Sequence, residues 1–255
     1  MYTLVRPLLF ALPAETAHNL TFSLLTAAGR WVNRLPPPIP LVPDERLAVE
    51  LAGLRFEHPI GLAAGLDKDA RLLPLWRRLG FSFVEVGTVT PRPQAGNPKP
   101  RLFRLPADGA LINRMGFNSA GLDVVARHLE ERPAGLIVGA NIGKNRDTPL
   151  EEAAADYREG ILRLADRCDY VTVNISSPNT PGLRALQEGG NLEHLLAALK
   201  SEQANLRAAH DRYVPIALKI APDLDDEQLA EIARLLIAHA FDGVIATNTT
   251  VARPG

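Results

Sequence analysis

Two kinds of polar side chain recur where short apolar runs of this sequence end. Asn141, Asn174 and Asn248 each follow such a run, and Lys219 follows another. A side-chain amide offers both a donor and an acceptor, so several amides around one cavity suit a planar, polar ligand whose edges alternate donors and acceptors. A lysine at the end of a strand suits an anion or a developing negative charge. The pattern therefore predicts a cavity for a small polar anion.

Three loops add further groups to this set. Residues 174–182 contain Ser177 and Asn179 among two prolines and a glycine, while Lys68 and Asn113 lie in two other loops. Lys68 would be a second fixed cation and Asn113 and Asn179 further amides. Ser177 adds a hydroxyl group to this constellation.

Other common chemistries fit the sequence poorly. No Asp or Glu ends an apolar run, which disfavours carboxylate-pair hydrolysis and magnesium-dependent phosphoryl transfer. Residues 139–145 resemble a phosphate-binding loop, but they have three residues between the glycines instead of four and Asn145 where Ser or Thr should hold magnesium. The six histidines show no metal-ligand spacing, so we expect no metal site.

The elements that must position these groups read as βα units. Six apolar runs are expected to be strands, with the carboxyl ends of parallel strands meeting at one face; they cover residues 59–64, 83–87, 136–140, 170–173, 216–218 and 243–246. Helices are expected between them, for instance over residues 70–79, 148–167, 191–209 and 225–239. The fold class predicted is α/β, a TIM-type (β/α)8 barrel, with residues 45–255 as its domain.

The barrel predicted here is incomplete. Residues 45–255 supply about six units, and each further unit needs about 30 residues, so the sequence is expected to stop before an eight-stranded ring closes. A truncated form of a longer protein is the resulting expectation. It leaves open that this chain is a non-catalytic remnant whose own activity is doubtful.

The segment before the barrel has a different composition. Residues 14–30 place apolar side chains at helical spacing, and residues 1–40 carry three arginines against one glutamate. We expect residues 1–35 to be a small amphipathic helical domain suited to a membrane surface, although a helical hairpin packed as a cap on its own barrel fits the pattern equally. Five prolines between residues 36 and 43 predict a stiff linker over residues 36–44.

Composition excludes several classes of protein. The 255 residues are 46% hydrophobic with a net charge of −1, which indicates a large core and no field for holding nucleic acid. No run of apolar residues is long enough to span a membrane, and no cleavable signal peptide is apparent. The lone Cys168 indicates a reducing compartment.

Six motifs in order resemble the class 2 dihydroorotate dehydrogenases, the flavin enzymes of pyrimidine (UMP) biosynthesis. The matching segments are residues 65–69 (GLDKD), 87–94 (GTVTPRPQ), 99–104 (KPRLFR), 112–118 (INRMGFN), 174–182 (NISSPNTPG) and 246–250 (ATNTT). The resemblance extends over the whole chain. Only the C-terminal part of the family, which supplies glycine-rich loops for the flavin phosphate, has no counterpart here.

The resemblance implies a set of site residues. Ser177 would be the catalytic base that takes a proton from dihydroorotate while hydride passes to FMN, giving orotate. The FMN contacts implied are Ala63, Ala64, Thr88, Asn141, Asn174, Lys219 and Thr247. The substrate contacts implied are Lys68, Asn113, Arg114, Met115, Gly116, Phe117, Asn174, Asn179, Asn248 and Thr249. Thr180 and Phe117 match neighbours on the route of the departing proton.

Two differences from class 1 relatives imply the electron acceptor. Class 1 enzymes carry a cysteine base in this loop and lack the N-terminal helices, whereas residues 174–182 contain no cysteine. A membrane quinone is therefore the implied acceptor, with His18 and Arg104 as candidates for its site. A monomer held peripherally, through its N-terminal helices, on the cytoplasmic face of the bacterial inner membrane would follow. A flavin-free barrel lyase or synthase is the alternative enzyme.

Overall fold

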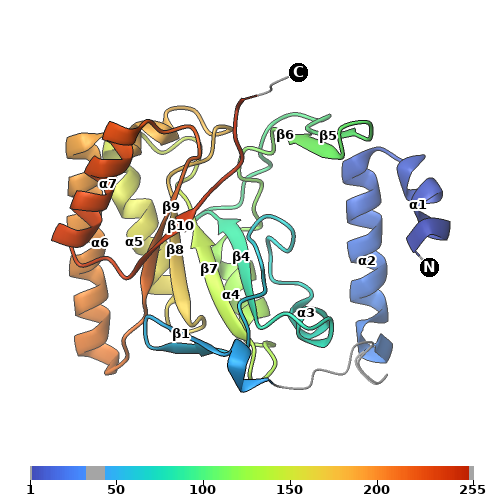
Figure 1. Cartoon of the computed structure of the whole chain (residues 1–255), viewed down its shortest axis with the longest axis horizontal. Coiled ribbons are helices and arrows are strands. Elements are labelled where there is room, and N and C mark those ends of the chain that lie inside the picture. The colour runs from blue at the N-terminus through green and yellow to red at the C-terminus, as the bar shows by residue number, and fades with distance from the viewer. Residues whose placement is uncertain (1, 33–43, 253–255) are drawn as a thin grey trace.

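The computed structural model describes residues 2–32 and 44–252, and its centre is one curled sheet of six parallel strands (Figure 1). The strands are β3 (Gly61–Leu62), β4 (Phe83–Val89), β7 (Ile137–Ile142), β8 (Tyr170–Asn174), β9 (Ile216–Ile220) and β10 (Gly243–Ala246). Their order across the sheet follows the chain, and β3 and β10 are its edges. This half-barrel confirms the predicted α/β, TIM-type fold and all six predicted strands.

Successive side chains along each strand point to opposite faces of the sheet, and in β4 both faces are buried. Val84 and Val86 of β4 are fully buried in the core formed with the helices. Glu85 between them faces the inside of the curled sheet, where Thr172 of β8 donates a hydrogen bond to it at 2.9 Å. Polar groups therefore line the concave side of the sheet, while valines attach its convex side to the helices.

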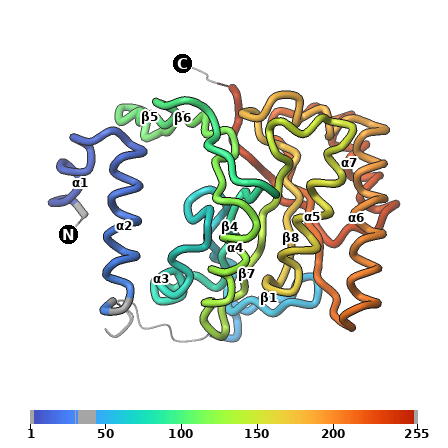
Figure 2. The backbone as a smooth tube through the Cα atoms, turned by 180° about the vertical axis from the view of Figure 1, so that it is seen from behind, coloured from blue at the N-terminus to red at the C-terminus, as the bar shows by residue number. Residues whose placement is uncertain are grey.

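Helices cover the convex side of the sheet (Figures 1 and 2). They are α3 (Leu73–Arg78), α4 (Leu122–Leu129), α5 (Ala153–Leu164), α6 (Gly189–His210) and α7 (Asp226–Ala238). Two short 3₁₀ helices, η2 (Leu150–Glu152) and η3 (Leu183–Gln187), precede α5 and α6, and η1 (Glu45–Leu47) precedes the sheet. Asp225 caps α7 in a capping box with Gln228, at the residue where the predicted helix over residues 225–239 begins.

Two hairpins extend the half-barrel. Strands β1 (Val49–Leu51) and β2 (Leu54–Phe56) pair at the amino-terminal end of the sheet, and β5 (Leu102–Leu105) and β6 (Ala110–Asn113) pair above the mouth (Figure 1). The turn between β5 and β6 contains Asp108–Gly109, with Gly109 at φ +60°, a combination that favours a hairpin. The β5–β6 hairpin carries Arg104 and Asn113, so it positions two of the predicted site residues.

The N-terminal helices α1 (Tyr2–Phe10) and α2 (Ala14–Val32) stand beside the barrel, next to the β5–β6 hairpin (Figure 2). Ala17 and Phe22 bury one side of α2, and the Phe22 ring lies 6.2 Å from that of Trp76 in α3. Leu4 and Leu8 of α1 are 79% and 71% exposed. None of the helices in the described ranges is long and apolar enough to cross a membrane. The predicted proline-rich linker, apart from Asp44, lies outside those ranges.

Candidate active site

A cavity of about 360 Å³ opens at the carboxyl ends of the strands, between the half-barrel, the β5–β6 hairpin and α2. The predicted residues that line it are His18, Ala64, Lys68, Thr88, Asn113, Met115, Gly116, Phe117, Asn174, Ser177, Asn179, Lys219, Asn248 and Thr249. These positions come from seven separate segments of the chain. The expectation that polar strand ends converge on one mouth therefore agrees with the geometry.

A buried amide network forms the wall behind the cavity. Thr88 donates to Asn141 Oδ1 at 2.5 Å, and Asn174 Nδ2 donates to Thr88 Oγ1 at 2.9 Å and to Asn141 Oδ1 at 3.2 Å. Gly87 allows the backbone of β4 to lie close to that of β7 at this point. It has φ +105°, and a Cβ at this position would lie 2.2 Å from the backbone carbonyl oxygen of Asn141. Asn141 itself is fully buried beneath Thr88. The network holds one face of the cavity rigid.

Lys219 and Glu85 place a buried pair of opposite charges next to this network. Lys219 is 8% exposed, and its Nζ lies 4.0 Å from Glu85 Oε1. Glu85 also accepts from Asn141 Nδ2 at 2.8 Å and from the Thr172 hydroxyl. The hydroxyl of Tyr170 faces the same carboxylate. Burial raises the pKa of Tyr170 well above its ordinary value, and the negative charge of Glu85 adds to this effect. Glu85 thus compensates the lysine charge from inside the sheet.

Lys68 supplies the second cation of the cavity. Its Nζ donates to Asn118 Oδ1 at 2.9 Å. Burial lowers the pKa of Lys68 from 10.5 to about 8, although Asp69 acts in the opposite direction. A partly buried ammonium with a lowered pKa is stabilised when an anion binds beside it.

Ser177 lies in the loop that closes the cavity from the β8 side. It is 5% exposed, and its Oγ accepts from the backbone N–H of Asn179 at 3.3 Å. Asn179 Nδ2 reaches the side-chain oxygen of Asn113 at 3.3 Å across the cavity. The hydroxyl of Thr180 is buried and has no hydrogen-bond partner in the described part of the chain. Ser177 therefore brings an engaged hydroxyl to the cavity lining, and Thr180 carries an unengaged hydroxyl three residues later in the same loop.

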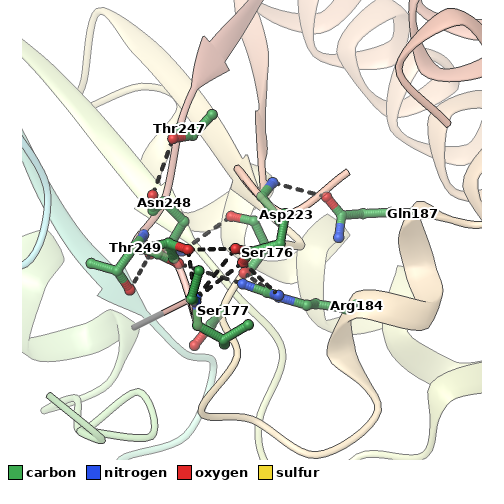
Figure 3. A network of polar contacts seen from close by, with 12 residues as sticks. Ser176, Ser177, Arg184, Gln187, Asp223, Thr247, Asn248 and Thr249 are labelled. Atoms are coloured by element: carbon green, nitrogen blue, oxygen red, sulfur yellow. Dashed lines mark hydrogen bonds and ion pairs between the residues drawn. The ribbon is translucent and has the colours of Figure 1, made fainter. Parts of the chain in front are cut away.

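The neighbouring Ser176 connects this loop to two asparagines (Figure 3). Its Oγ donates to Asn174 Oδ1 at 3.0 Å and accepts from Asn248 Nδ2 at 3.0 Å. Asn248 is held in turn by its backbone N–H, which donates to the carbonyl of Ile220 at 3.0 Å. Three strand ends thereby share one hydrogen-bond network.

Helix α2 contributes its own side chains to the cavity wall. His18 lines the cavity, stacks at 4.3 Å on Phe22 and has its pKa lowered chiefly by burial. Glu15, one turn earlier, also lines the cavity and accepts hydrogen bonds from Arg101. The α2 helix is thus part of the site wall as well as an appendage of the barrel.

Four predicted contact residues, and in addition the buried Asn141, lie outside the lining of this cavity. Arg104 donates to the carbonyls of Leu9 and Leu12 at the end of α1, and its guanidinium lies 4.6 Å from the Phe10 ring centroid. The other three are Ala63, which lines a cleft inside the half-barrel, Arg114, which donates to the Pro100 carbonyl, and the exposed Thr247. Asn141 lies behind Thr88 and Asn174, which line the cavity and are both hydrogen-bonded to its side-chain oxygen.

Sequence reasoning did not find several residues that shape this site. Glu85 had one visible signal, a single charged residue inside an otherwise apolar strand. Glu15 and Arg101 are 86 residues apart, and Arg184 and Asp223 are 39 apart, so no local pattern connects either pair. In the described ranges no group of three or more His, Cys, Asp or Glu side chains could hold a metal ion.

The parallel half-barrel and its amide- and lysine-lined mouth fit an enzyme of the α/β-barrel class, whose sites lie at the carboxyl ends of the strands. Comparison with known proteins narrows this class. Residues 46–255 match the sequence pattern of the family described as dihydroorotate dehydrogenase. The chain belongs to the dihydroorotate dehydrogenase family, in its quinone-dependent class 2. This assignment rules out the flavin-free lyase.

Individual relatives agree over nearly the whole chain. The sequence is 52% identical over 257 residues to the dihydroorotate dehydrogenase (quinone) of Cellvibrio japonicus (strain Ueda107), which covers 100% of this chain and 74% of that protein. It is 54% identical over 255 residues to the enzyme of the same name from Paraburkholderia xenovorans (strain LB400), covering 99% and 74%. A crystal structure of the Eimeria tenella dihydroorotate dehydrogenase with ferulenol superposes with a TM-score of 0.85 at 42% identity, covering 94% of this chain and 68% of that one.

Proposed function

We propose that Ser177 is the base in the oxidation of dihydroorotate to orotate, the step of pyrimidine biosynthesis that this flavin-dependent oxidoreductase carries out with a quinone as electron acceptor. The observation that carries the proposal is that Ser177 shares one cavity with two lysines and four asparagines. In this reaction one ring carbon loses a proton and its neighbour loses hydride, so a proton acceptor and a hydride acceptor must lie on the two sides of the substrate.

Ser177 needs help to accept a proton, because a serine hydroxyl is a weak base. Support comes from its burial and from the Asn179 N–H, which donates to Oγ and stabilises negative charge there as the proton moves. The buried, unpartnered hydroxyl of Thr180 is suited to relay the proton away from the loop. Phe117, 5% exposed, keeps water from the opposite wall.

FMN is the flavin proposed for the site. The donor set fits an isoalloxazine ring, since Thr88, Asn174 and Lys219 present hydroxyl, amide and ammonium groups on one wall, with the amide of Asn141 behind them. When bound, the flavin supplies hydride acceptance and the later transfer of two electrons to the quinone. Lys219 would stabilise negative charge on it, and Ala63, Ala64 and Thr247 complete the proposed contacts.

The substrate is proposed to bind on the other side of the cavity. Lys68 is suited to its carboxylate, because a partly buried ammonium gains most from a direct anionic partner. The amides of Asn113, Asn179 and Asn248 and the hydroxyl of Thr249 suit the alternating donors and acceptors of the cyclic imide. Arg114, Met115, Gly116 and Phe117 are assigned to the segment that forms the adjoining wall.

The quinone is proposed to approach along α2. His18 is the side chain of α2 that both lines the cavity and carries a ring nitrogen, and its lowered pKa favours the neutral ring at neutral pH. Arg104 would act indirectly, by holding the end of α1. The exposed leucines of α1 and α2 suit peripheral contact with the cytoplasmic face of the bacterial inner membrane. Residues 1–35 form this element in the proposal, residues 36–44 its linker and residues 45–255 the FMN-binding barrel of a monomer.

Ser177→Ala tests the base assignment. In the flavin-loaded enzyme we expect flavin reduction by dihydroorotate to slow by about 100- to 10,000-fold, the usual worth of a positioned proton acceptor. Flavin content should not change, because the proposed flavin contacts lie elsewhere. Ser201→Ala, at an exposed position of α6, is the matched control. Normal reduction by the Ser177 variant would refute the assignment.

The alternative of a non-catalytic chain has its own test. The purified 255-residue chain is mixed with FMN, passed through gel filtration and examined for bound flavin and for bleaching by dihydroorotate. Retention and bleaching together would exclude the alternative, whereas loss of the flavin would support it.

A further inference from the structure

Arg184, in η3, connects the three loops that follow β8, β9 and β10 (Figure 3). Its Nε donates to the carbonyl oxygen of Ser176 at 3.1 Å, and its Nη1 donates to Asp223 Oδ2 at 3.0 Å. The remaining Nη2 reaches the carbonyl oxygen of Thr249 at 3.4 Å. The side chains of Arg184 and Asp223 are 26% and 21% exposed, so the contact is partly accessible to water.

Two neighbouring contacts strengthen this connection. Asp223 also accepts from the backbone N–H of Val251 at 3.2 Å, beyond the end of β10. Gln187, three residues after Arg184 in the chain and 6% exposed, accepts from the backbone N–H of Ala221 at 3.0 Å. One 3₁₀ helix therefore holds the β9 loop at two points, and that loop holds the β10 segment.

The geometry bears directly on the proposed base. Ser177 immediately follows Ser176, so a displacement of the Ser176 carbonyl also displaces the Ser177 hydroxyl. The Ser176 side chain is held by Asn174 and Asn248, while its carbonyl is held by Arg184 on the other side of the backbone. Arg184 does not line the cavity, so its effect on a bound substrate has to pass through the loop.

We propose that Arg184 is a positioning residue for proton transfer, which sets the distance between Ser177 and the substrate held by Asn248 and Thr249. This inference rests on the proposed role of Ser177. A planar guanidinium can serve a carboxylate and two carbonyls in fixed directions, whereas a lysine offers one point charge on a flexible stem. Asp223 is the partner that orients the guanidinium, since it faces the opposite side from Ser176.

Arg184→Lys tests the proposal in the flavin-loaded enzyme, because it retains the charge and loses the directed fork. Stopped-flow absorbance follows flavin reduction at saturating dihydroorotate, with normal substrate and with substrate deuterated at the carbon that loses the proton. We expect the rate of flavin reduction to fall by about 10- to 100-fold, because a displacement of a reacting group by about 1 Å has an effect of this size. The isotope effect should increase, because proton transfer becomes the slower step. Asp223→Asn should change both quantities in the same direction but less.

Controls separate positioning from a general loss of structure. Arg234→Lys alters an exposed Arg–Glu pair on α7 and should leave rate and isotope effect unchanged. Flavin content and the thermal unfolding midpoint should remain normal in Arg184→Lys. If that variant does not fold, Asp223→Asn, which retains the guanidinium, decides the question.

Two outcomes would overturn the proposal: an unchanged isotope effect in both variants, or a rate that falls only in proportion to lost flavin. Ser177→Ala tells the two proposals apart. An inactive Ser177 variant with a normal Arg184 variant refutes only the positioning role, whereas an active Ser177 variant refutes the base assignment on which it rests.

Discussion

The ion pair between Glu15 of α2 and Arg101 of the barrel allows a quantitative test of how the N-terminal helices are attached. Arg101 Nη2 donates to Glu15 Oε1 at 2.8 Å, and Nε lies 3.2 Å from both carboxylate oxygens. The side chains are 6% and 13% exposed for Arg101 and Glu15. Removing one partner of such a buried pair costs about 3–5 kcal/mol, because the other charge is left unpaired.

Glu15→Gln is the perturbation. Glutamine retains one acceptor oxygen, and Arg101 still donates to the carbonyls of Ala95 and Asn97, so the expected cost is reduced to about 2–3 kcal/mol. The hydrogen bond from Arg101 holds the pKa of Glu15 below its ordinary value of 4.5. A lowered folded-state pKa gives stability that is complete above pH 4.5 and is lost as the pH falls through the folded-state value. The difference between wild type and variant should therefore be full at neutral pH and shrink in acid.

Urea unfolding followed by tryptophan fluorescence measures this difference. Trp76 is 7% exposed and lies next to Phe22 of α2, so its signal reports whether α2 remains docked. Glu231→Gln, which breaks the exposed pair with Arg234, is the matched control and should cost less than about 1 kcal/mol. A variant within 0.5 kcal/mol of wild type at neutral pH, on the order of a surface substitution, would refute the reasoning. So would a difference that does not change with pH.

Three further predictions follow from the same geometry. Lys219→Ala should lower the flavin reduction potential by about 30–65 mV, which is the equivalent of one lost interaction with a charged group. Spectroelectrochemistry of the holoenzyme measures this potential, and an unchanged or higher value would refute the proposed stabilisation of negative charge by Lys219. The KM for dihydroorotate should rise as the pH increases through about 8, where Lys68 loses its proton, and Lys68→Met should remove this pH dependence from an already high KM. The double variant Leu4→Glu and Leu8→Glu should release the enzyme from lipid vesicles, as measured by co-sedimentation. In stopped-flow assays it should reduce a long-chain quinone more slowly, while flavin reduction by dihydroorotate stays normal. An equal loss of both half-reactions would contradict this prediction.

Much of the barrel could be predicted because its central strands, β4, β7, β8 and β9, are buried on both faces. A run such as residues 170–173 is apolar enough to stand out, and the polar residue that ends it marks the mouth of the sheet. The β5–β6 hairpin had only short runs, although its Asp108–Gly109 turn was a usable signal. Local pattern therefore found the apolar strands of the sheet, including its partly buried edge strands, and missed the hairpin that covers the edge of the site.

Long-range polar contacts could not be predicted in the same way. Whether Arg184 faces solvent or Asp223 depends on the curvature of the sheet and on the loop lengths between β8 and β9, which no local periodicity encodes. The same holds for Glu15 and Arg101, whose meeting requires α2 to dock against the hairpin. Glu85 shows the intermediate case, since a charge in an apolar strand signals a buried partner without naming it.

The position of α2 decides which variants can separate the reaction with dihydroorotate from the reaction with the quinone. Glu15 and His18 line the same cavity as Ser177, so α2 forms one wall of the proposed dihydroorotate site in addition to its proposed contact with the membrane. Removing the whole helix would leave Arg101 buried without its carboxylate and would also open the cavity to water. Loss of both half-reactions after such a deletion would then follow even if α2 serves the quinone alone. Substitutions confined to the exposed leucines of α1 avoid this ambiguity, because they leave the Glu15–Arg101 pair and the cavity wall unchanged. Substitutions on the exposed side of the two helices, rather than deletion of a helix, can therefore distinguish a role in membrane contact from a role in closing the cavity.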